Sequence, residues 1–171
     1  MAVQTGRTVS RFINFSVEDD TDTMREIPVT DISVVGVVYE EQDMTAFQDA
    51  VKSALPNMPD APIEISGPFD STAVQAASAS AAVPALSGSH TVLNAICGGM
   101  TPLALDVQFG IRHTYEAGEP QFGISSDSDN TNGYICTSYT VGADLMYSAK
   151  FVLYPGSTLP AWGIALETVT P

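Results

Sequence analysis

Residues 125–133 hold the densest group of potential metal ligands in the chain, in the order Ser-Ser-Asp-Ser-Asp-Asn-Thr-Asn-Gly. An EF-hand calcium loop requires oxygen ligands at its first, third and fifth positions, glycine at the sixth and an acid at the twelfth. Counting from Asp127, the sixth residue is Asn132 and the twelfth is Ser138, so the pattern fails at both positions. We therefore expect a solvated polar loop that binds no metal.

Side chains that could support catalysis are few and scattered. The only histidines are His90, at the start of an expected helix, and His113, on the apolar face of an expected strand, and both are interpreted as structural. The sequence has no Gly-x-Ser-x-Gly elbow and no phosphate-binding glycine loop. Its two cysteines, Cys97 and Cys136, lie too far apart for a zinc motif. We expect no enzymatic activity and no cofactor.

The charge balance limits the possible partners. The chain carries 20 acidic and 6 basic residues, a formal net charge of −14. Such a surface repels phosphate backbones and releases almost no counterions, which argues against direct nucleic-acid binding. No apolar stretch is long enough to span a membrane, and no apolar segment follows a basic start, so we expect a cytoplasmic product with reduced, buried cysteines.

The clearest structural signal is a hairpin over Tyr134–Tyr154, whose two arms are rich in aromatic and β-branched residues around a turn at Gly142, Ala143 and Asp144. Leu103–Tyr115 is the best alternating strand. Further strands are expected at Phe12–Val17, Met24–Val29, Ile32–Tyr39, Ile63–Ile65, around Phe122, and Ile164–Val169.

Two helices are predicted from apolar spacing. Met44, Phe47, Val51 and Leu55 favour a helix over Asp43–Leu55 that ends at Pro56. Ser89 is expected to cap a second helix, which ends at Gly98 and Gly99. The Ala- and Ser-rich residues 71–88 are expected to form a long surface loop, with a helix over Ala73–Ala82 as the alternative.

These elements predict a mainly β fold, an antiparallel sandwich or barrel with one or two flanking helices. Residues 1–11 are polar and aperiodic and are expected to form a flexible N-terminal arm, with residues 12–171 forming one domain. Trp162, the only tryptophan, lies between Pro160 and Gly163 and is a candidate anchor for the core, the turn or an interface.

Several segments together resemble bacteriophage tail-tube proteins. In chain order, these segments are Val37–Ala46 with the following residues to Leu55, Ile65–Ala73, Gly118–Phe122 and Leu159–Gly163. The resemblance implies a virion structural protein assembled in the host cytoplasm. Its copies would close into rings, usually of six, that stack into a tube through which DNA passes without specific binding. It also implies contacts with other tail or head proteins, and stacking through the arm with Arg7 and Arg11.

If the chain lines a channel, some of its carboxylates should face the lumen, because DNA must pass without forming salt links. The candidates are Asp106, opposite the apolar face of its strand, Glu64 in a short strand, and Asp144 at the hairpin turn. Two other classes remain open. One is a capsid-decoration or head–tail neck protein, and the other is a small cytoplasmic binding module.

Overall fold

The structure, a computed structural model, describes residues 13–46, 51, 54–73, 85–110, 118–125 and 131–164. The elements in chain order are β1 (Ile13–Glu18), β2 (Met24–Ile27), β3 (Asp31–Ile32), β4 (Val38–Asp43), β5 (Ala54–Asp60), β6 (Ile63–Pro68), β7 (Ala85–Leu86), α1 (Ser89–Ile96), β8 (Leu105–Phe109), β9 (Pro120–Ile124), β10 (Tyr134–Val141), β11 (Met146–Leu153) and β12 (Ala161–Ile164). The expected N-terminal arm, residues 1–11, lies outside the described residues, as do His113 and most of the 71–88 loop.

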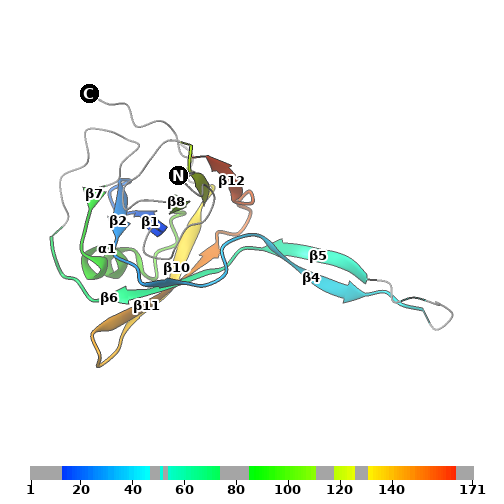
Figure 1. Cartoon of the computed structure of the whole chain (residues 1–171), viewed down its shortest axis with the longest axis horizontal. Coiled ribbons are helices and arrows are strands. Elements are labelled where there is room, and N and C mark those ends of the chain that lie inside the picture. The colour runs from blue at the N-terminus through cyan, green and yellow to red at the C-terminus, as the bar shows by residue number, and fades with distance from the viewer. Residues whose placement is uncertain are drawn as a thin grey trace, which may run out of the picture.

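Two sheets form the body of the molecule (Figure 1). The larger sheet has six strands in the order β12-β9-β8-β1-β2-β7, and the smaller has four in the order β10-β11-β6-β3. All pairings are antiparallel except that of β2 with β7. The prediction of a mainly β, antiparallel sandwich with a flanking helix is confirmed.

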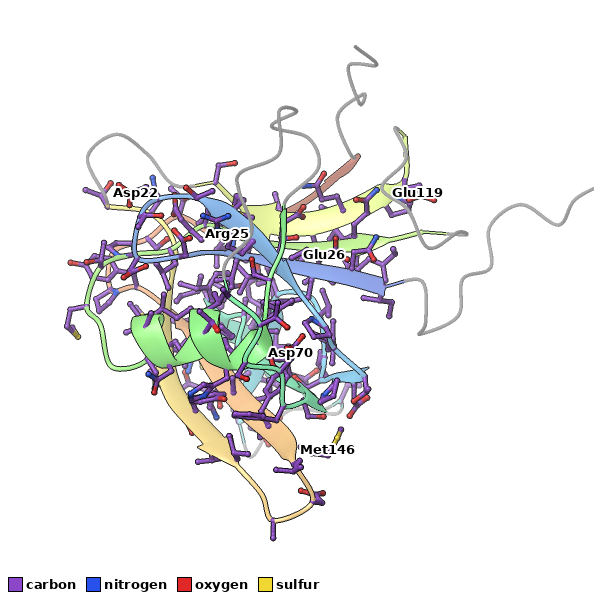
Figure 2. The ribbon with its side chains drawn as sticks, turned by 90° about the vertical axis from the view of Figure 1, so that its left-hand side faces the viewer. Asp22, Arg25, Glu26, Asp70, Glu119 and Met146 are labelled. Atoms are coloured by element: carbon purple, nitrogen blue, oxygen red, sulfur yellow. The ribbon has the colours of Figure 1, made fainter. Side chains whose placement is uncertain are left out.

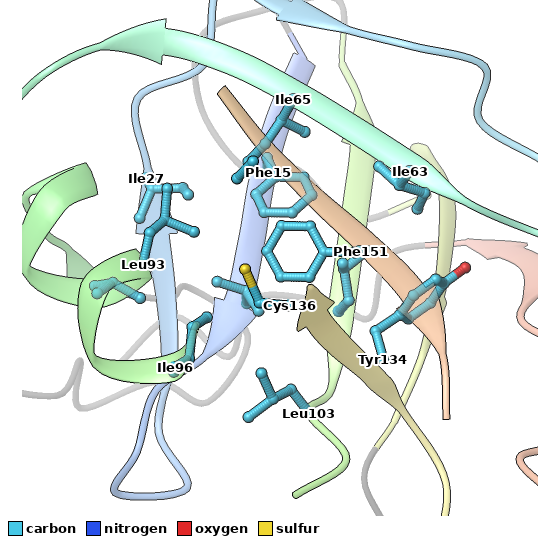
Figure 3. Close-up of a cluster of buried hydrophobic side chains, with 14 of the residues drawn as sticks. Phe15, Ile27, Ile63, Ile65, Leu93, Ile96, Leu103, Tyr134, Cys136 and Phe151 are labelled. Atoms are coloured by element: carbon cyan, nitrogen blue, oxygen red, sulfur yellow. The ribbon is translucent and has the colours of Figure 1, made fainter. Parts of the chain in front are cut away.

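Alternating apolar residues from both sheets meet in one core (Figure 3). Phe15 of β1 and Phe151 of β11 lie in contact between the sheets, with ring centroids 5.7 Å apart. Leu105 and Val107 of β8 are fully buried, as the alternation of that strand predicts. Burying side chains of this size contributes about 1.5–3 kcal/mol each, so these contacts are the main source of the body's stability.

Helix α1 closes one end of the core by contacting both β2 and β10. Val92, Leu93 and Ile96 form its buried face, and the helix ends before Gly98, whose φ of +80° favours glycine. The expectation that Ser89 caps it is wrong, because the N-cap is Gly88. The Ser89 hydroxyl instead donates to the Pro68 carbonyl at 2.9 Å and accepts from the Asp70 N–H at 3.1 Å.

The β10–β11 hairpin is present where the sequence predicts it, and Figure 2 shows its end extending beyond the helix, with Met146 near the turn. Its alternation is interrupted, because the register shifts between Cys136 and Ser138. Beyond this bulge it is Tyr139, not Ser138, that packs against the core. The turn also extends to Leu145, which adopts a φ of +58°.

The predicted helix over Asp43–Leu55 is wrong at its described residues. Asp43 pairs with Ala54 and Gln42 pairs with Leu55, so both ends of the segment belong to a two-stranded antiparallel ribbon. The expected strand over Ile32–Tyr39 is divided into β3 and β4 around Gly36, whose φ is +145°. The last described strand, Ala161–Ile164, begins earlier than predicted, and residues 165–171 lie outside the described residues.

Candidate assembly surface

The ribbon of β4 and β5 forms a sheet of its own and projects far from the sandwich (Figure 1). Its side chains are almost all exposed, including large apolar ones: Tyr39 is 51% exposed and Met58 is 84% exposed. An isolated two-stranded ribbon is at best marginally stable in water. Exposed apolar side chains on such an element indicate a surface that becomes covered by a partner.

A second exposed aromatic lies at the edge of the six-stranded sheet. Trp162, on edge strand β12, is 56% exposed although its ring packs 5.1 Å from that of Phe122 and 5.5 Å from that of Phe109. Its inner face is therefore held by the protein while its outer face remains in solvent. A rigidly seated, half-exposed tryptophan is typical of an interface anchor.

The outer face of the four-stranded sheet carries Glu64 and Lys150 on adjacent strands, joined by a 2.8 Å ion pair. Hydrogen bonding and the charge of Glu64 raise the pKa of Lys150. Both side chains are about half exposed, so the pair has little effect on stability. Of the two basic residues within the described part of the chain, Arg25 is buried against Asp19 at 2.6 Å, and Lys150 is exposed.

Asp144 lies where the sequence predicts it, exposed at the tip of the β10–β11 hairpin. Its Oδ1 accepts a hydrogen bond from the Met146 N–H at 3.2 Å, which helps to hold the turn. Glu64 and Asp144 are therefore both available to solvent.

Asp106 lies on the side of β8 that faces away from the core, as the alternation predicts, but it is only partly exposed. Its neighbour across β1, Ser16, is fully buried. Burial raises the pKa of Asp106 to about 6, although hydrogen bonds from Gln121 and the Val107 backbone act in the opposite direction. Its Oδ1 has no hydrogen-bond partner. Asp106 is thus enclosed more than a freely solvated lumenal carboxylate would be.

The described histidine has a structural setting. His90 Nδ1 lies 2.9 Å from the Tyr139 hydroxyl, and its ring stacks near Phe69 at 4.8 Å. The contact with Tyr139 connects the first turn of α1 to strand β10, and the contact with Phe69 connects it to the residue that follows β6. The sequence predicts that His90 lies at the start of a helix, and in the structure it is the second residue of α1.

Both cysteines are free thiols, with Cys136 buried and Cys97 half-buried. Among the described residues, no group of three histidine, cysteine or acidic side chains converges on a metal-sized site. Within the same residues no helix combines the length and the apolar character needed to cross a bilayer. Arg7, Arg11 and most of the 125–133 loop lie outside the described part of the chain.

The sequence did not predict the exposed β4–β5 ribbon, because the spacing of its apolar residues fits a helix. Pro56 and Pro59 were the available signal, since two prolines three apart are more compatible with an extended edge strand than with a helix end alone.

No protein-family model matches this sequence, and no curated protein matches it either. The fold does recur in solved structures of contractile injection systems. A chain in the structure of the anti-feeding prophage cap, the AFP tube terminating cap, matches with a TM-score of 0.55 and 13% identity over 96% of this chain and 95% of its own.

Two further structures match similarly. A chain of the 6-fold symmetrised anti-feeding prophage baseplate gives a TM-score of 0.56 at 9% identity, covering 94% of this chain and 97% of its own. A chain of the sheath/tube terminator of the extracellular contractile injection system PVC gives 0.55 at 12% identity, covering 95% and 99%. The present chain therefore shares its fold, over nearly its whole length, with components of the anti-feeding prophage and of an extracellular contractile injection system.

Proposed function

We propose that this chain is a structural subunit of a phage tail or a related tail-like particle, most specifically a tube subunit. In this proposal, copies close into rings, of six by analogy with the tail-tube family, and the rings stack around a channel that conducts DNA. The subunit performs no catalysis and uses no cofactor. It also contacts other tail or head proteins of the virion.

The observation that carries the proposal is the exposed ribbon β4–β5. Its apolar side chains, Tyr39, Leu55 and Met58 among them, are exposed and have no core beneath them among the residues that the structure describes. In an assembly these side chains would be covered by neighbouring copies, which supplies the burial that the ribbon lacks alone. The fold shared with injection-system components supports the same reading.

The net charge of −14 suits a DNA-conducting channel. Phosphates passing an acidic wall find few cations and so form few counterion-releasing contacts. Glu64 and Asp144 are the exposed candidates for this wall, and Asp106 is the enclosed one. Trp162 is the proposed anchor between subunits, together with Arg7 and Arg11 of the arm.

The test is to express the full chain, purify it, and examine it by negative-stain electron microscopy and sedimentation velocity over a range of concentrations. Annular particles or stacked tubes with a central channel are expected. Trp162→Ala should shift the distribution toward monomers without unfolding them, whereas Val34→Ala, at another exposed apolar residue, should not. A protein that remains monomeric at every concentration would overturn the proposal.

Two other candidates give different particles in the same images. A subunit that terminates a tube, as in the cap and terminator structures that share the fold, would form single rings that do not stack. A capsid-decoration or neck protein would remain monomeric or form small closed oligomers, its acidity serving outer-surface solubility.

A further inference from the structure

The two long edges of the ribbon differ in their ability to pair with another strand. Strand β5 contains Pro56 and Pro59, and a proline has no N–H to donate to a β-ladder. Strand β4 contains no proline. Prolines on an edge strand prevent regular pairing along that edge.

The pairing register shows whether the backbone positions of the two prolines face into the ribbon or outward from it. Pro59 lies opposite Tyr39 and Pro56 lies opposite Glu41. Because a hydrogen-bonded antiparallel pair needs an N–H from both residues, these two pairs are of the non-hydrogen-bonded kind. Their backbone groups therefore point away from the ribbon's middle. On β5 this direction is blocked by proline, whereas on β4 it exposes the N–H and C=O groups of Tyr39 and Glu41.

The same alternation makes the backbone of Asp43 point outward. In the described part of the chain, no backbone hydrogen bond reaches Tyr39, Glu41 or Asp43 from outside the ribbon. Strand β4 thus presents three alternate residues whose outward backbone groups have no hydrogen-bond partner among the described residues.

Among the described residues, the body of the molecule has one long edge strand, β10, because the described parts of the other sheet-edge strands, β3, β7 and β12, comprise two to four residues each. In the first half of β10, the backbone groups that face away from β11 already have hydrogen-bond partners. Tyr134 exchanges two 2.8 Å bonds with Leu103, and the Cys136 carbonyl accepts from the Gly98 N–H at 3.0 Å.

The second half of the β10 edge is open. The Gly142 N–H donates inward to the Met146 carbonyl at 2.8 Å, so by alternation Val141 and Tyr139 direct their backbone groups outward. Neither has a backbone partner on that side among the described residues.

Charge favours a match between these two edges. Strand β4 carries Glu40, Glu41 and Asp43, so its partner surface must be neutral or basic. The open end of β10, Ser138–Val141, carries no charge, and Lys150 lies directly opposite Ser138 on β11. Lys150 is paired with Glu64, so the surface that a strand added to β10 would meet is close to neutral.

We propose that β4 of one copy adds as a strand to the open end of β10 of a second copy, while the proline-bearing edge of β5 faces away from the contact. The inference rests on the proposed self-assembly and specifies which edges form it. Main-chain hydrogen bonds provide the affinity in such strand addition, and the asymmetry between the two edges of the ribbon fixes its orientation.

Proline substitutions at outward-pointing positions test the contact. Glu41→Pro and Val141→Pro each remove one outward N–H without removing a bond inside the subunit, and each should reduce the assembly constant by about tenfold or more. The matched controls are Glu41→Ala and Val141→Ala, which remove the side chain alone, and Ala54→Pro, at the equivalent outward position of β5. Each proline variant is compared with the alanine variant at the same position, and Ala54→Pro should assemble like the wild type. Circular dichroism of each variant checks its fold.

Assembly of Glu41→Pro at the level of Glu41→Ala would overturn the inference. A measurement on the unaltered chain adds a second criterion: amide hydrogen exchange in assembled against dilute protein should show new protection at residues 39–43 and 138–141. Protection confined to residues 54–60 contradicts the assignment of edges. Failure of the wild type to assemble is visible before any variant is compared, and it removes the proposed function itself.

Discussion

Cys97 follows the end of helix α1, and its thiol neighbours that of Cys136 on strand β10. Burial, reinforced by the neighbouring Cys97 thiol, raises the pKa of Cys136 to about 12. The adjacent Gly98 N–H donates to the Cys136 carbonyl at 3.0 Å, so backbone and side chains together connect the helix to the hairpin.

The greater burial and the raised pKa of Cys136 predict that the two thiols are labelled at different rates. The thiolate is the reactive form, and a thiol with a pKa near 12 is deprotonated at pH 8 only on the order of one part in ten thousand. Maleimide at pH 8 should therefore modify half-buried Cys97 slowly and leave Cys136 unmodified until denaturant is added. Mass spectrometry of digested protein reports each site. Equal labelling of both cysteines in the folded protein, or a disulfide between them, would contradict this prediction.

The pKa of Asp106 predicts a stability that depends on pH. Its pKa rises from about 3.8 to about 6 on folding, so the folded state binds more protons between these values. The stabilising contribution of the protonated Asp106 is fully present below pH 4. It is lost as the pH rises through about 6, and the free energy of unfolding then no longer changes on account of this group.

Asp106→Asn removes this charge, so it should increase the free energy of unfolding at pH 8 by about 1–3 kcal/mol and have little effect at pH 4. Urea unfolding at the two pH values measures the difference. Asp144→Asn, at an exposed position, is the matched control. An equal effect of Asp106→Asn at both pH values would show that the change is unrelated to ionisation.

Gly88 allows the start of helix α1 to approach the backbone of the preceding loop. A Cβ at this position would lie 2.5 Å from the Thr72 carbonyl oxygen and 2.7 Å from that of Asp70. Gly88→Ala should therefore displace the helix and lower the free energy of unfolding by about 1–3 kcal/mol. Gly163→Ala, where none of the described residues lies within 4 Å of the added Cβ, should leave the midpoint of chemical unfolding of the monomer unchanged. Comparable midpoints for the two variants would argue against the close approach.

Reversing the charge at the exposed wall candidates tests the channel. Glu64→Lys combined with Asp144→Lys should leave rings and tubes intact but slow or block the passage of DNA, because lysines attract phosphates. Retention of a labelled DNA fragment by purified tubes, and its decrease with added salt, provides the measurement. Asp106 is omitted because a lysine there would place a cation in an enclosed site. Tubes that assemble but retain no more DNA than the wild type would remove Glu64 and Asp144 from the proposed wall.

The sequence was most informative where local pattern and burial agree. The alternation of Leu105 and Val107 located β8, and Val92, Leu93 and Ile96 located α1, because one face of each element packs against the core. The fold class followed from the number of such strands. What alternation did not reveal is the bulge after Cys136, which changes the face presented by the rest of β10.

The ribbon was mispredicted for a physical reason. Helical spacing of Met44 and Leu55 implies a buried face, yet these side chains are 53% and 54% exposed. An apolar pattern shows which side chains are expected to be buried from solvent. It does not show whether they are buried within the subunit or against a neighbouring one. The same limit applies to Asp106, whose enclosure depends on strands far away in the sequence.

The position of β1 inside the six-stranded sheet sets the order in which the chain can fold. Ile13 pairs with Phe109, so this sheet cannot form before synthesis has passed Phe109, and such long-range pairing is slow. The ribbon is a local hairpin and can form once Asp60 has emerged. Its acidic residues, Glu40 and Glu41, then oppose premature aggregation on the ribosome. A nascent chain therefore exposes its ribbon long before it completes the β10 edge that could accept the ribbon of another copy.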